Sequence, residues 1–264
     1  MLSTIPTSQS VRSVDGTLIG FDRLGDGPPL ILVEAAAHYR DFSSFDGLVP
    51  LLAEDFTVYT YDRRGRGEST DTRPYAPDRE VEDLEALIAA AGGAAHVYGY
   101  SSGALLAMHA AAQGLPIGRL ALLEPPLQDD ADPAGADLTR ELAELIDAGR
   151  RGDAVTHFHE SIGVPPELVA ELRSAPSWPK MESVAHTLVY DCMLSDVTTS
   201  AMLRSVAAPT LVLDSMGSSD DLTGWAAAVA EGLPDGSHRS LAGEWHGVPD
   251  ETLAVALMEF FLPR

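Results

Sequence analysis

Residues 96–108 read HVYGYSSGALLAM, and this stretch decides the fold. An apolar run typical of a buried strand stops at a Gly-x-Ser-x-Gly segment, and an alanine-rich run typical of a helix follows. Ser101 therefore stands at a sharp corner between Gly99 and Gly103, where the missing side chains let neighbouring backbone come close. A serine in this position is either a nucleophile or an N-cap that only begins the helix.

The composition is that of an acidic globular protein. The chain has 264 residues, of which 45% are hydrophobic and 22% charged, and its formal net charge is −23. Phosphate binding needs clustered Lys and Arg, and Lys180 is the only lysine, so we exclude nucleic acid as a partner. The single cysteine, Cys192, excludes an intrachain disulfide and has no neighbouring cation to activate its thiol.

Nothing in the sequence predicts a membrane partner. Residues 1–13 (MLSTIPTSQSVRS) lack the charged and apolar regions of a signal peptide, and no run of about 18 apolar residues occurs. No Cys/His cluster has the spacing of a metal site, and no nucleotide-binding loop is present, so we expect neither metal nor cofactor. We expect a cytoplasmic protein, and the sequence leaves a homodimer open.

Strand and helix patterns alternate along most of the chain. A hairpin turns at Asp15-Gly16, and buried or alternating strands are predicted at 28–35, 56–62, 94–100, 118–126, 208–215 and 236–243, with helices between most of them. This order predicts an α/β fold with a mostly parallel central sheet covered by helices on both faces. Residues 127–207 show no strand pattern, and amphipathic helices are predicted there at 137–152, 167–174 and 178–194. We predict a core of 1–126 and 208–264 with a helical cap inserted at 127–207.

A serine hydroxyl becomes a nucleophile only when a base takes its proton. We favour His246 as that base, because it lies between the last predicted strand and the last helix, in a loop that returns to the carboxyl edge of the sheet. His38, after the first buried strand, is the alternative. His157 and His159 are predicted to be surface or cap residues, because side chains two apart on a helix point in different directions.

At this point the sequence resembles the α/β-hydrolase superfamily, in its serine-nucleophile branch, over nearly the whole chain. Four matches in order carry the resemblance: LILV at 30–33 with its loop, DRRGRGES at 62–69, GYSSG at 99–103, and the late histidine His246. The turn at 62–69 looks like the family's structural signature D-x-R-G-x-G-x-S. The alanine-rich, nearly lysine-free sequence is also similar to that of actinobacterial esterases.

The resemblance leaves two places for the acid that orients the base. The family most often takes it from the loop after the strand at 208–215, where Asp214, Asp220 and Asp221 lie. Haloalkane dehalogenases and the fungal zearalenone lactonases instead use a glutamate directly after the preceding strand, where this chain has Glu124 followed by proline. We favour Glu124, because a carboxylate that ends an apolar strand requires a partner, and keep Asp214 as the alternative.

The resemblance also implies an oxyanion hole and a substrate pocket. One donor is the backbone N–H of Ser102, and the second comes from the loop after the first buried strand. The family often carries His-Gly there, whereas this chain has Glu34-Ala35, so we predict the N–H of Ala36 as the second donor. The residues predicted to contact substrate come from this loop and from the cap: Glu34, Ala35, Trp178, Met181, His186 and Tyr190.

The identity of the predicted nucleophile limits which reactions the protein can catalyse. Relatives that open epoxides or remove halide use aspartate at the elbow, so Ser101 favours acyl transfer. We expect a hydrolase that cleaves an ester or lactone of a hydrophobic small molecule through an acyl-enzyme, and a macrocyclic lactone of the zearalenone type fits the position of Glu124. Two alternatives stay open: a non-hydrolytic lyase or cyclase on the same fold, and a ligand-binding receptor.

Overall fold

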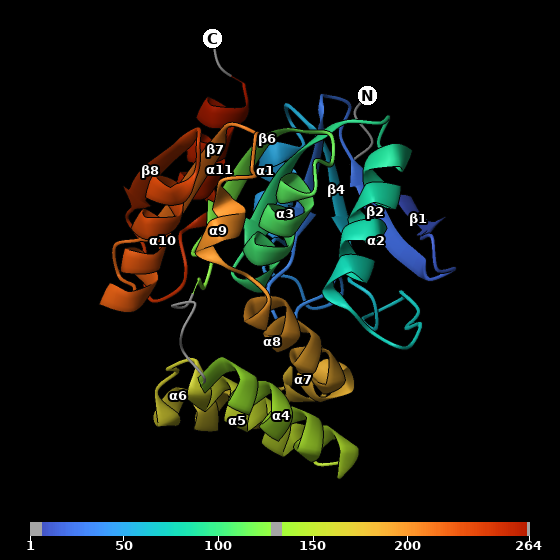
Figure 1. Cartoon of the computed structure of the whole chain (residues 1–264), viewed down its shortest axis with the longest axis vertical. Coiled ribbons are helices and arrows are strands. Elements are labelled where there is room, and N and C mark those ends of the chain that lie inside the picture. Colours follow the sequence, from blue (N-terminus) through green and yellow to red (C-terminus); the bar gives the residue numbers. More distant parts are fainter. Residues whose placement is uncertain (1–6, 128–133, 263–264) are drawn as a thin grey trace.

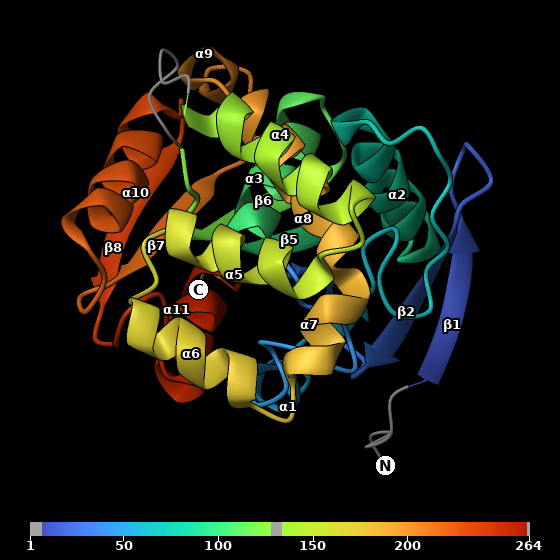
Figure 2. The same cartoon turned by 90° about the horizontal axis from the view of Figure 1, so that it is seen from below.

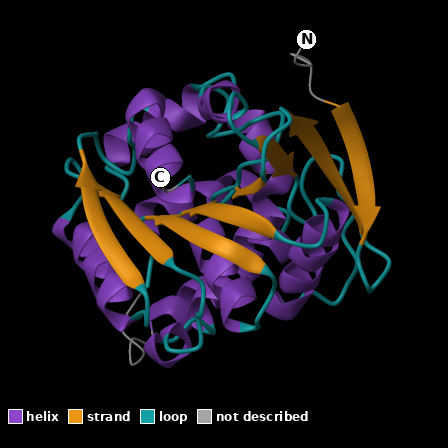
Figure 3. Ribbon diagram, turned by 90° about the horizontal axis from the view of Figure 1, so that it is seen from above, coloured by secondary structure: helices purple, strands orange, loops and turns teal. Residues whose placement is uncertain are grey.

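A computed structural model describes residues 7–127 and 134–262 of the chain (Figure 1). Eight strands form its centre: β1 (Thr7–Arg12), β2 (Leu18–Leu24), β3 (Pro29–Val33), β4 (Thr57–Tyr61), β5 (Ala95–Tyr100), β6 (Ile117–Leu123), β7 (Thr210–Ser215) and β8 (Gly236–Leu241). They make one sheet in the order β1-β2-β4-β3-β5-β6-β7-β8. The pairs from β4 to β8 are parallel, and β1 and β2 form an antiparallel edge, seen at one side of the sheet in Figure 3.

Helices cover both faces of this sheet, as predicted. Outside the insertion they are α1 (Leu48–Leu52), α2 (Pro77–Ala90), α3 (Ser102–Ala112), α10 (Asp220–Gly232) and α11 (Asp250–Phe261). Side chains alternate along a strand, so each strand serves two cores. Leu32 and Tyr98 pack with α1 and α11, whereas Val33 and Val97 pack with α2, α3 and α10. Strands covered on both faces explain why their sequences read as continuous apolar runs.

A run of helices separates β6 from β7. It comprises α4 (Ala134–Asp147), α5 (Arg151–Ser161), α6 (Pro166–Ser174), α7 (Trp178–Val184), the 3₁₀ turn η1 (Ala185–Thr187), α8 (Leu188–Asp196) and α9 (Ser200–Leu203). Helices α4 to α7 gather at one end of the core, and Figure 2 views the molecule from that end. None of the helices in the described part is both long and apolar enough to cross a bilayer.

The predicted domain limits fall partly outside the described residues. Residues 1–6, 128–133 and 263–264, which belong to the predicted core and insertion, are not described. Within the insertion, α4 to α8 share an apolar cluster that contains Leu142, Phe158 and Trp178. Leu203 of α9 instead packs with the core of the sheet. The division at 127 and 207 therefore stays a prediction.

The reversal between β5 and α3 is a single residue long. Ser101 has φ +54° and ψ −120°, a conformation that L residues rarely adopt. The flanking glycines are required by close contacts rather than by their own dihedrals. A Cβ on Gly99 would lie 2.6 Å from the carbonyl oxygen of Gly103, and a Cβ on Gly103 would lie 2.3 Å from that of Val33. The first turn of α3 therefore lies directly against the end of β3.

Gly103→Ala tests this contact. The added methyl group must push α3 away from β3, so we expect the free energy of unfolding to fall by about 1–3 kcal/mol, as for other overpacked sites. Gly224→Ala is the matched control, because Gly224 lies inside α10 with no atom within 4 Å of its added Cβ. It should stabilise the protein by about 0.5–1 kcal/mol. Urea denaturation measures both changes, and equal effects at the two glycines would contradict the packing described here.

Candidate active site

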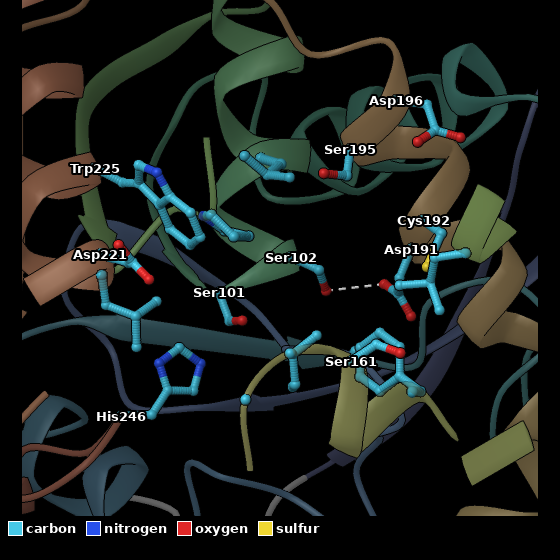
Figure 4. A pocket seen from close by; sticks show the side chains of 18 of the residues that line it. Ser101, Ser102, Ser161, Asp191, Cys192, Ser195, Asp196, Asp221, Trp225 and His246 are labelled. Carbon is cyan, nitrogen blue, oxygen red and sulfur yellow. Dashed lines mark hydrogen bonds between the residues drawn. The ribbon is translucent and has the colours of Figure 1, made fainter. Parts of the chain in front are cut away.

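Ser101 faces a cavity of about 260 Å³ between the core and the inserted helices (Figure 4). The core contributes Ser101, Ser102 and His246, and the insertion contributes Phe158 of α5 together with Asp191 and Cys192 of α8. A second cavity of about 540 Å³ also reaches Ser101 and His246, and its other lining residues are mostly apolar side chains, among them Phe42, Val164, Leu168, Leu172 and Met181.

His246 lies in the loop between β8 and α11, where three contacts hold it. Its backbone N–H donates to the Ser218 hydroxyl at 2.9 Å, and its carbonyl accepts from the Tyr100 hydroxyl. Its Nδ1 lies 2.5 Å from Oε2 of Glu124. A proton on Nδ1 satisfies this contact and leaves Nε2 as the basic nitrogen. In Figure 4 the ring and the Ser101 hydroxyl face the same pocket, although no hydrogen bond joins these two described residues.

Glu124 follows β6 directly and is fully buried. Both carboxylate oxygens have partners, because Oε1 accepts the backbone N–H of Ser215 at 2.8 Å and Oε2 faces His246. Burial by itself would raise the pKa of Glu124, but the hydrogen bonds from His246, Ser218 and Ser215 outweigh it and lower the pKa. The group is therefore held as a carboxylate that can orient the imidazole and balance its positive charge.

The alternative acids do not meet His246. Asp214 is buried at the end of β7, but its Oδ2 pairs with His238 of β8 and accepts the Ser240 hydroxyl at 3.2 Å. Asp220 and Asp221 begin α10, and Asp221 lines the smaller cavity. The structure thus brings Glu124, and not Asp214, to the proposed base.

Strained backbone is concentrated at this site. Among the described residues, the non-glycine residues with positive φ are Ala37 (+59°), Ser101 (+54°), Glu124 (+47°) and His246 (+53°). Such conformations cost about 1–3 kcal/mol each and persist where the surrounding structure enforces them, which is often at functional sites. All three proposed catalytic residues belong to this set, and Ala37 follows the proposed oxyanion donor.

Two backbone N–H groups near Ser101 are free to bind an oxyanion. Ser102 is the first residue of α3, and the N–H groups in the first turn of a helix have no acceptor within the helix. The N–H of Ala36 belongs to the loop after β3, and Ala36 lines both cavities together with Ser101. Within the described part of the chain, neither N–H meets an acceptor.

Glu34 lies beneath the site rather than in it. Its side chain is buried, lines neither cavity, and its Oε1 accepts the Ser43 hydroxyl at 2.5 Å and the Ser44 N–H at 2.9 Å. This contact closes the loop that contains Ala35 and Ala36. Burial outweighs the hydrogen bonds and raises the pKa of Glu34 to about 7.

The other predicted substrate contacts divide between the cavity wall and the interior. Ala35 and Met181 line the larger cavity. Trp178 packs inside the cluster of the inserted helices and lines neither cavity. Tyr190 stacks on Tyr75 with ring centroids 3.8 Å apart, and His186 packs edge-on against Tyr190. Neither residue lines either of the two cavities at Ser101.

Several residues that line the two cavities are not predicted from the sequence. Phe158 and Ile162 lie in and after α5, a helix that the sequence patterns do not predict. Trp245 could have been found, because it precedes the proposed base directly. His38, the alternative base, turns its Nδ1 to the carbonyl oxygen of Ala36 at 2.8 Å and lines the larger cavity.

Glu34→Gln tests the burial of this carboxyl group. Its pKa is raised from the usual 4.5 to about 7, so the folded state holds a proton that the unfolded state loses above pH 4.5. This group therefore lowers stability progressively as the pH rises from about 4.5 to 7. We expect the unfolding free energy of Glu34→Gln, relative to that of the wild type, to rise by roughly 3 kcal/mol between pH 4 and pH 8. Urea titrations at both pH values measure it, and a difference independent of pH would disprove the shift.

Comparison with known proteins agrees with this architecture. The alpha/beta hydrolase family model matches residues 25–255. The crystal structure of an alpha/beta hydrolase from Sphaerobacter thermophilus is 48% identical, covers 96% of this chain and 100% of that chain, and superposes with a TM-score of 0.89. The fold class predicted from the sequence, and the resemblance on which it partly rested, are confirmed.

Curated relatives match over shorter stretches. N-formylmaleamate deformylase from Pseudomonas putida is 41% identical over 107 residues, which are 39% of each chain. The Mycobacterium tuberculosis protein named "Probable oxidoreductase EphD" is 37% identical over 93 residues, which are 33% of this chain and 15% of that protein. The chain therefore spans only a minor part of the length of these relatives. The family match covers most of the chain, and the chain belongs to the alpha/beta hydrolase family.

Proposed function

We propose that this protein is a serine hydrolase that cleaves a carboxylic ester or lactone of a hydrophobic small molecule through an acyl-enzyme. The observation that carries the proposal is the 2.5 Å contact between Nδ1 of His246 and the buried carboxylate of Glu124, beside the elbow that holds Ser101. A buried, ionised acid that orients an imidazole facing a serine is the arrangement that serine nucleophiles require.

In the first half of the proposed reaction, Oγ of Ser101 attacks the carbonyl carbon of the substrate. Nε2 of His246 accepts the hydroxyl proton, and the carboxylate of Glu124 balances the charge of the resulting imidazolium. The oxyanion that forms accepts hydrogen bonds from the N–H groups of Ser102 and Ala36. Each such donor contributes about 3–4 kcal/mol to lowering the barrier. The imidazolium then protonates the leaving alcohol, and the acyl group stays on Ser101.

In the second half, water enters the cavity and His246 removes one of its protons. The resulting hydroxide attacks the acyl carbon, and a second oxyanion forms in the same hole. When this intermediate collapses, the bond from the acyl carbon to Oγ of Ser101 breaks, the acid leaves, and the imidazolium of His246 returns its proton to Oγ, which restores the Ser101 hydroxyl. In a lactone the leaving alcohol and the acid belong to one molecule, so the same steps yield a single hydroxy acid.

The lining residues support an apolar and uncharged substrate. The larger cavity is bordered mainly by aliphatic and aromatic side chains, and its volume of about 540 Å³ is in the range of pockets for drug-sized ligands. Asp196 and Asp221 add carboxylates to the wall of the smaller cavity, which disfavours anionic substrates. A macrocyclic lactone of the zearalenone type is one such substrate, and we propose it for the first screen.

Activity-based labelling tests the nucleophile and its base. We expect a fluorophosphonate probe to label Ser101, and p-nitrophenyl acetate and butyrate to be hydrolysed. Ser101→Ala should abolish labelling, and both Ser101→Ala and His246→Ala should lower kcat/KM by at least about 1,000-fold, because each removes a member of the catalytic unit. Mass spectrometry of the labelled peptide and absorbance assays measure these outcomes.

The same experiment separates the alternatives. Labelling of Ser101 without turnover of any ester, lactone or amide tested would favour a lyase or cyclase over a hydrolase. N-formylmaleamate belongs in the amide set, because a relative is named for its deformylation. Absence of labelling together with tight binding of a small molecule would favour a receptor.

A pair of carboxylate variants tests the acid. Glu124→Gln should lower kcat by about 100- to 10,000-fold, because the imidazole loses the partner that holds its tautomer. Asp214→Asn is the matched control, since it also neutralises a buried carboxylate that contacts a histidine, but that histidine is His238. We expect its kcat to change less than about fivefold. The reverse order would show that Asp214 is the acid.

A further inference from the structure

One carboxylate from the inserted helices reaches into the core beside Ser101. Asp191 of α8 is buried, and its Oδ1 accepts the Ser102 hydroxyl at 2.8 Å, the contact drawn as a dashed line in Figure 4. The same oxygen accepts Nη1 of Arg63 at 2.7 Å, and Oδ2 accepts Nη2 of Arg66 at 2.7 Å. Asp191 therefore contacts three residues of the core, one of which is the proposed oxyanion donor Ser102.

The two arginines continue the network to the loop after β3. Nη1 of Arg66 donates to the carbonyl oxygens of Ala35 at 2.7 Å and of His38 at 3.1 Å. Nη1 of Arg63 donates to the Ser102 hydroxyl at 3.1 Å. Both guanidinium groups are buried and come from the turn at 62–69, between β4 and α2.

The carbonyl that Arg66 contacts belongs to the peptide unit of the proposed second donor. The C=O of Ala35 and the N–H of Ala36 are two ends of one planar trans amide, so they point in opposite directions. A guanidinium bound to the carbonyl fixes the orientation of this amide. It also withdraws electron density from the amide, which makes the N–H a stronger donor, and this effect is larger in a buried site.

We propose that Asp191, through Arg66 and Ser102, positions both donors of the oxyanion hole, and that Arg66 in addition polarises the Ala35–Ala36 amide. Asp191 and Arg66 are positioning residues in this scheme, because neither touches the reacting atoms. The inference rests on the proposed function, since it concerns the oxyanion of that reaction. It adds that a residue of the inserted helices completes the catalytic centre.

The charges of the network are balanced, and this balance matters for the oxyanion. Arg63 pairs with Glu80 at 2.7 Å as well as with Asp191, so two guanidinium groups face two carboxylates. Burial would raise the pKa of Asp191, but the charges of Arg66 and Arg63 outweigh it and keep the pKa low. Loss of Arg66 would leave Asp191 and Glu80 with the single guanidinium of Arg63, and the excess negative charge near Ser102 would oppose the negative charge of the oxyanion.

The test uses three conservative variants of the full-length protein. Arg66→Lys keeps the charge but replaces the planar fork, whose two terminal nitrogens hold Ala35 and Asp191, by a single nitrogen. Asp191→Asn keeps the shape but removes the charge. Arg64→Lys is the matched control, because Arg64 is equally buried in the same turn but binds Asp83 and Asp15. Thermal unfolding of all three shows that each variant is folded at the assay temperature.

Steady-state kinetics with p-nitrophenyl butyrate give the first readout. We expect Arg66→Lys and Asp191→Asn to lower kcat by about 10- to 100-fold, somewhat less than the loss of a whole oxyanion donor, with KM changed less than threefold. Arg64→Lys should change kcat less than threefold. Equal losses of kcat for Arg64→Lys and Arg66→Lys would overturn the inference, because the arginines would then serve the fold alone.

A trifluoromethyl ketone gives the second readout, which a structural role would not move. The ketone forms a hemiketal with Ser101, and the pKa of the hemiketal hydroxyl, followed by ¹⁹F NMR, reports how strongly the hole stabilises an oxyanion. We expect this pKa to rise by about one unit or more in Arg66→Lys, which keeps the charge, and to stay at the wild-type value in Arg64→Lys. Asp191→Asn also removes a negative charge beside Ser102, which by itself lowers this pKa, so Arg66→Lys is the variant that decides this readout. An unchanged pKa in Arg66→Lys would overturn the inference while the wild-type adduct upholds the proposed function. If the wild type forms no adduct and Ser101→Ala behaves identically, the proposed function itself fails.

Discussion

The chain reverses from β5 into α3 within the single residue Ser101, and the geometry of the site depends on this reversal. The corner requires a left-handed backbone at Ser101 and bare backbone at Gly99 and Gly103. Because Gly103 lies against the carbonyl of Val33, the start of α3 and the end of β3 are in direct contact. One proposed oxyanion donor, Ser102, lies at the start of α3, and the other, Ala36, lies in the loop after β3. The elbow thus determines how far apart the donors lie.

The sheet positions the other catalytic candidates by continuing its hydrogen bonds past the ends of the strands. The N–H of Ser101 donates to the carbonyl of Leu123, and the N–H of Glu124 donates to that of Leu213, each at 2.9 Å. The N–H of Ser215 then holds the Glu124 carboxylate. Each residue is thereby tied to the neighbouring strand, which explains how Ser101 and Glu124 keep positive φ angles. Strain at Ser101 and Glu124 is thus supported by hydrogen bonds to neighbouring strands of the sheet.

The sequence predicted the sheet better than the insertion, for physical reasons. Strands buried on both faces give long apolar runs, and the elbow needs two glycines at fixed positions, so both leave a clear pattern. Helix α5 buries only Ala154, Val155 and Phe158, which is too weak a stripe to predict a helix. Trp178 and Tyr190 have side chains that suit a pocket wall, yet Trp178 packs among the inserted helices and Tyr190 stacks on Tyr75. The sequence does not predict this, because an apolar side chain on a helix does not reveal which neighbour covers it.

The partners of Asp191 illustrate a second limit. Residues 190–193 read YDCM, and nothing in that string indicates that the aspartate will meet two arginines located 125 and 128 positions earlier. The turn at 62–69 resembles a structural signature of the family, so its sequence predicts no role in the active site. A motif of this kind describes the backbone conformation, whereas the role of its side chains depends on which distant residues the fold brings to them.

Stability alone does not account for such a network. A buried ion pair recovers in attraction about what it loses in desolvation, and apolar residues of similar volume often serve as well or better. Removing one partner of a buried pair, by contrast, lowers stability by about 3–5 kcal/mol, because the other charge stays buried without a partner. The charged residues of such a network must therefore be kept together. Apolar packing cannot orient a peptide group, whereas a guanidinium holds the groups that it binds in a fixed orientation. Arg66 binds two carbonyl groups of the loop after β3 and the carboxylate of Asp191 on α8. In a chain with a net charge of −23, the burial of Arg63 and Arg66 is consistent with such an orienting role, because both contact Asp191 and the loop after β3 that contains the proposed second donor.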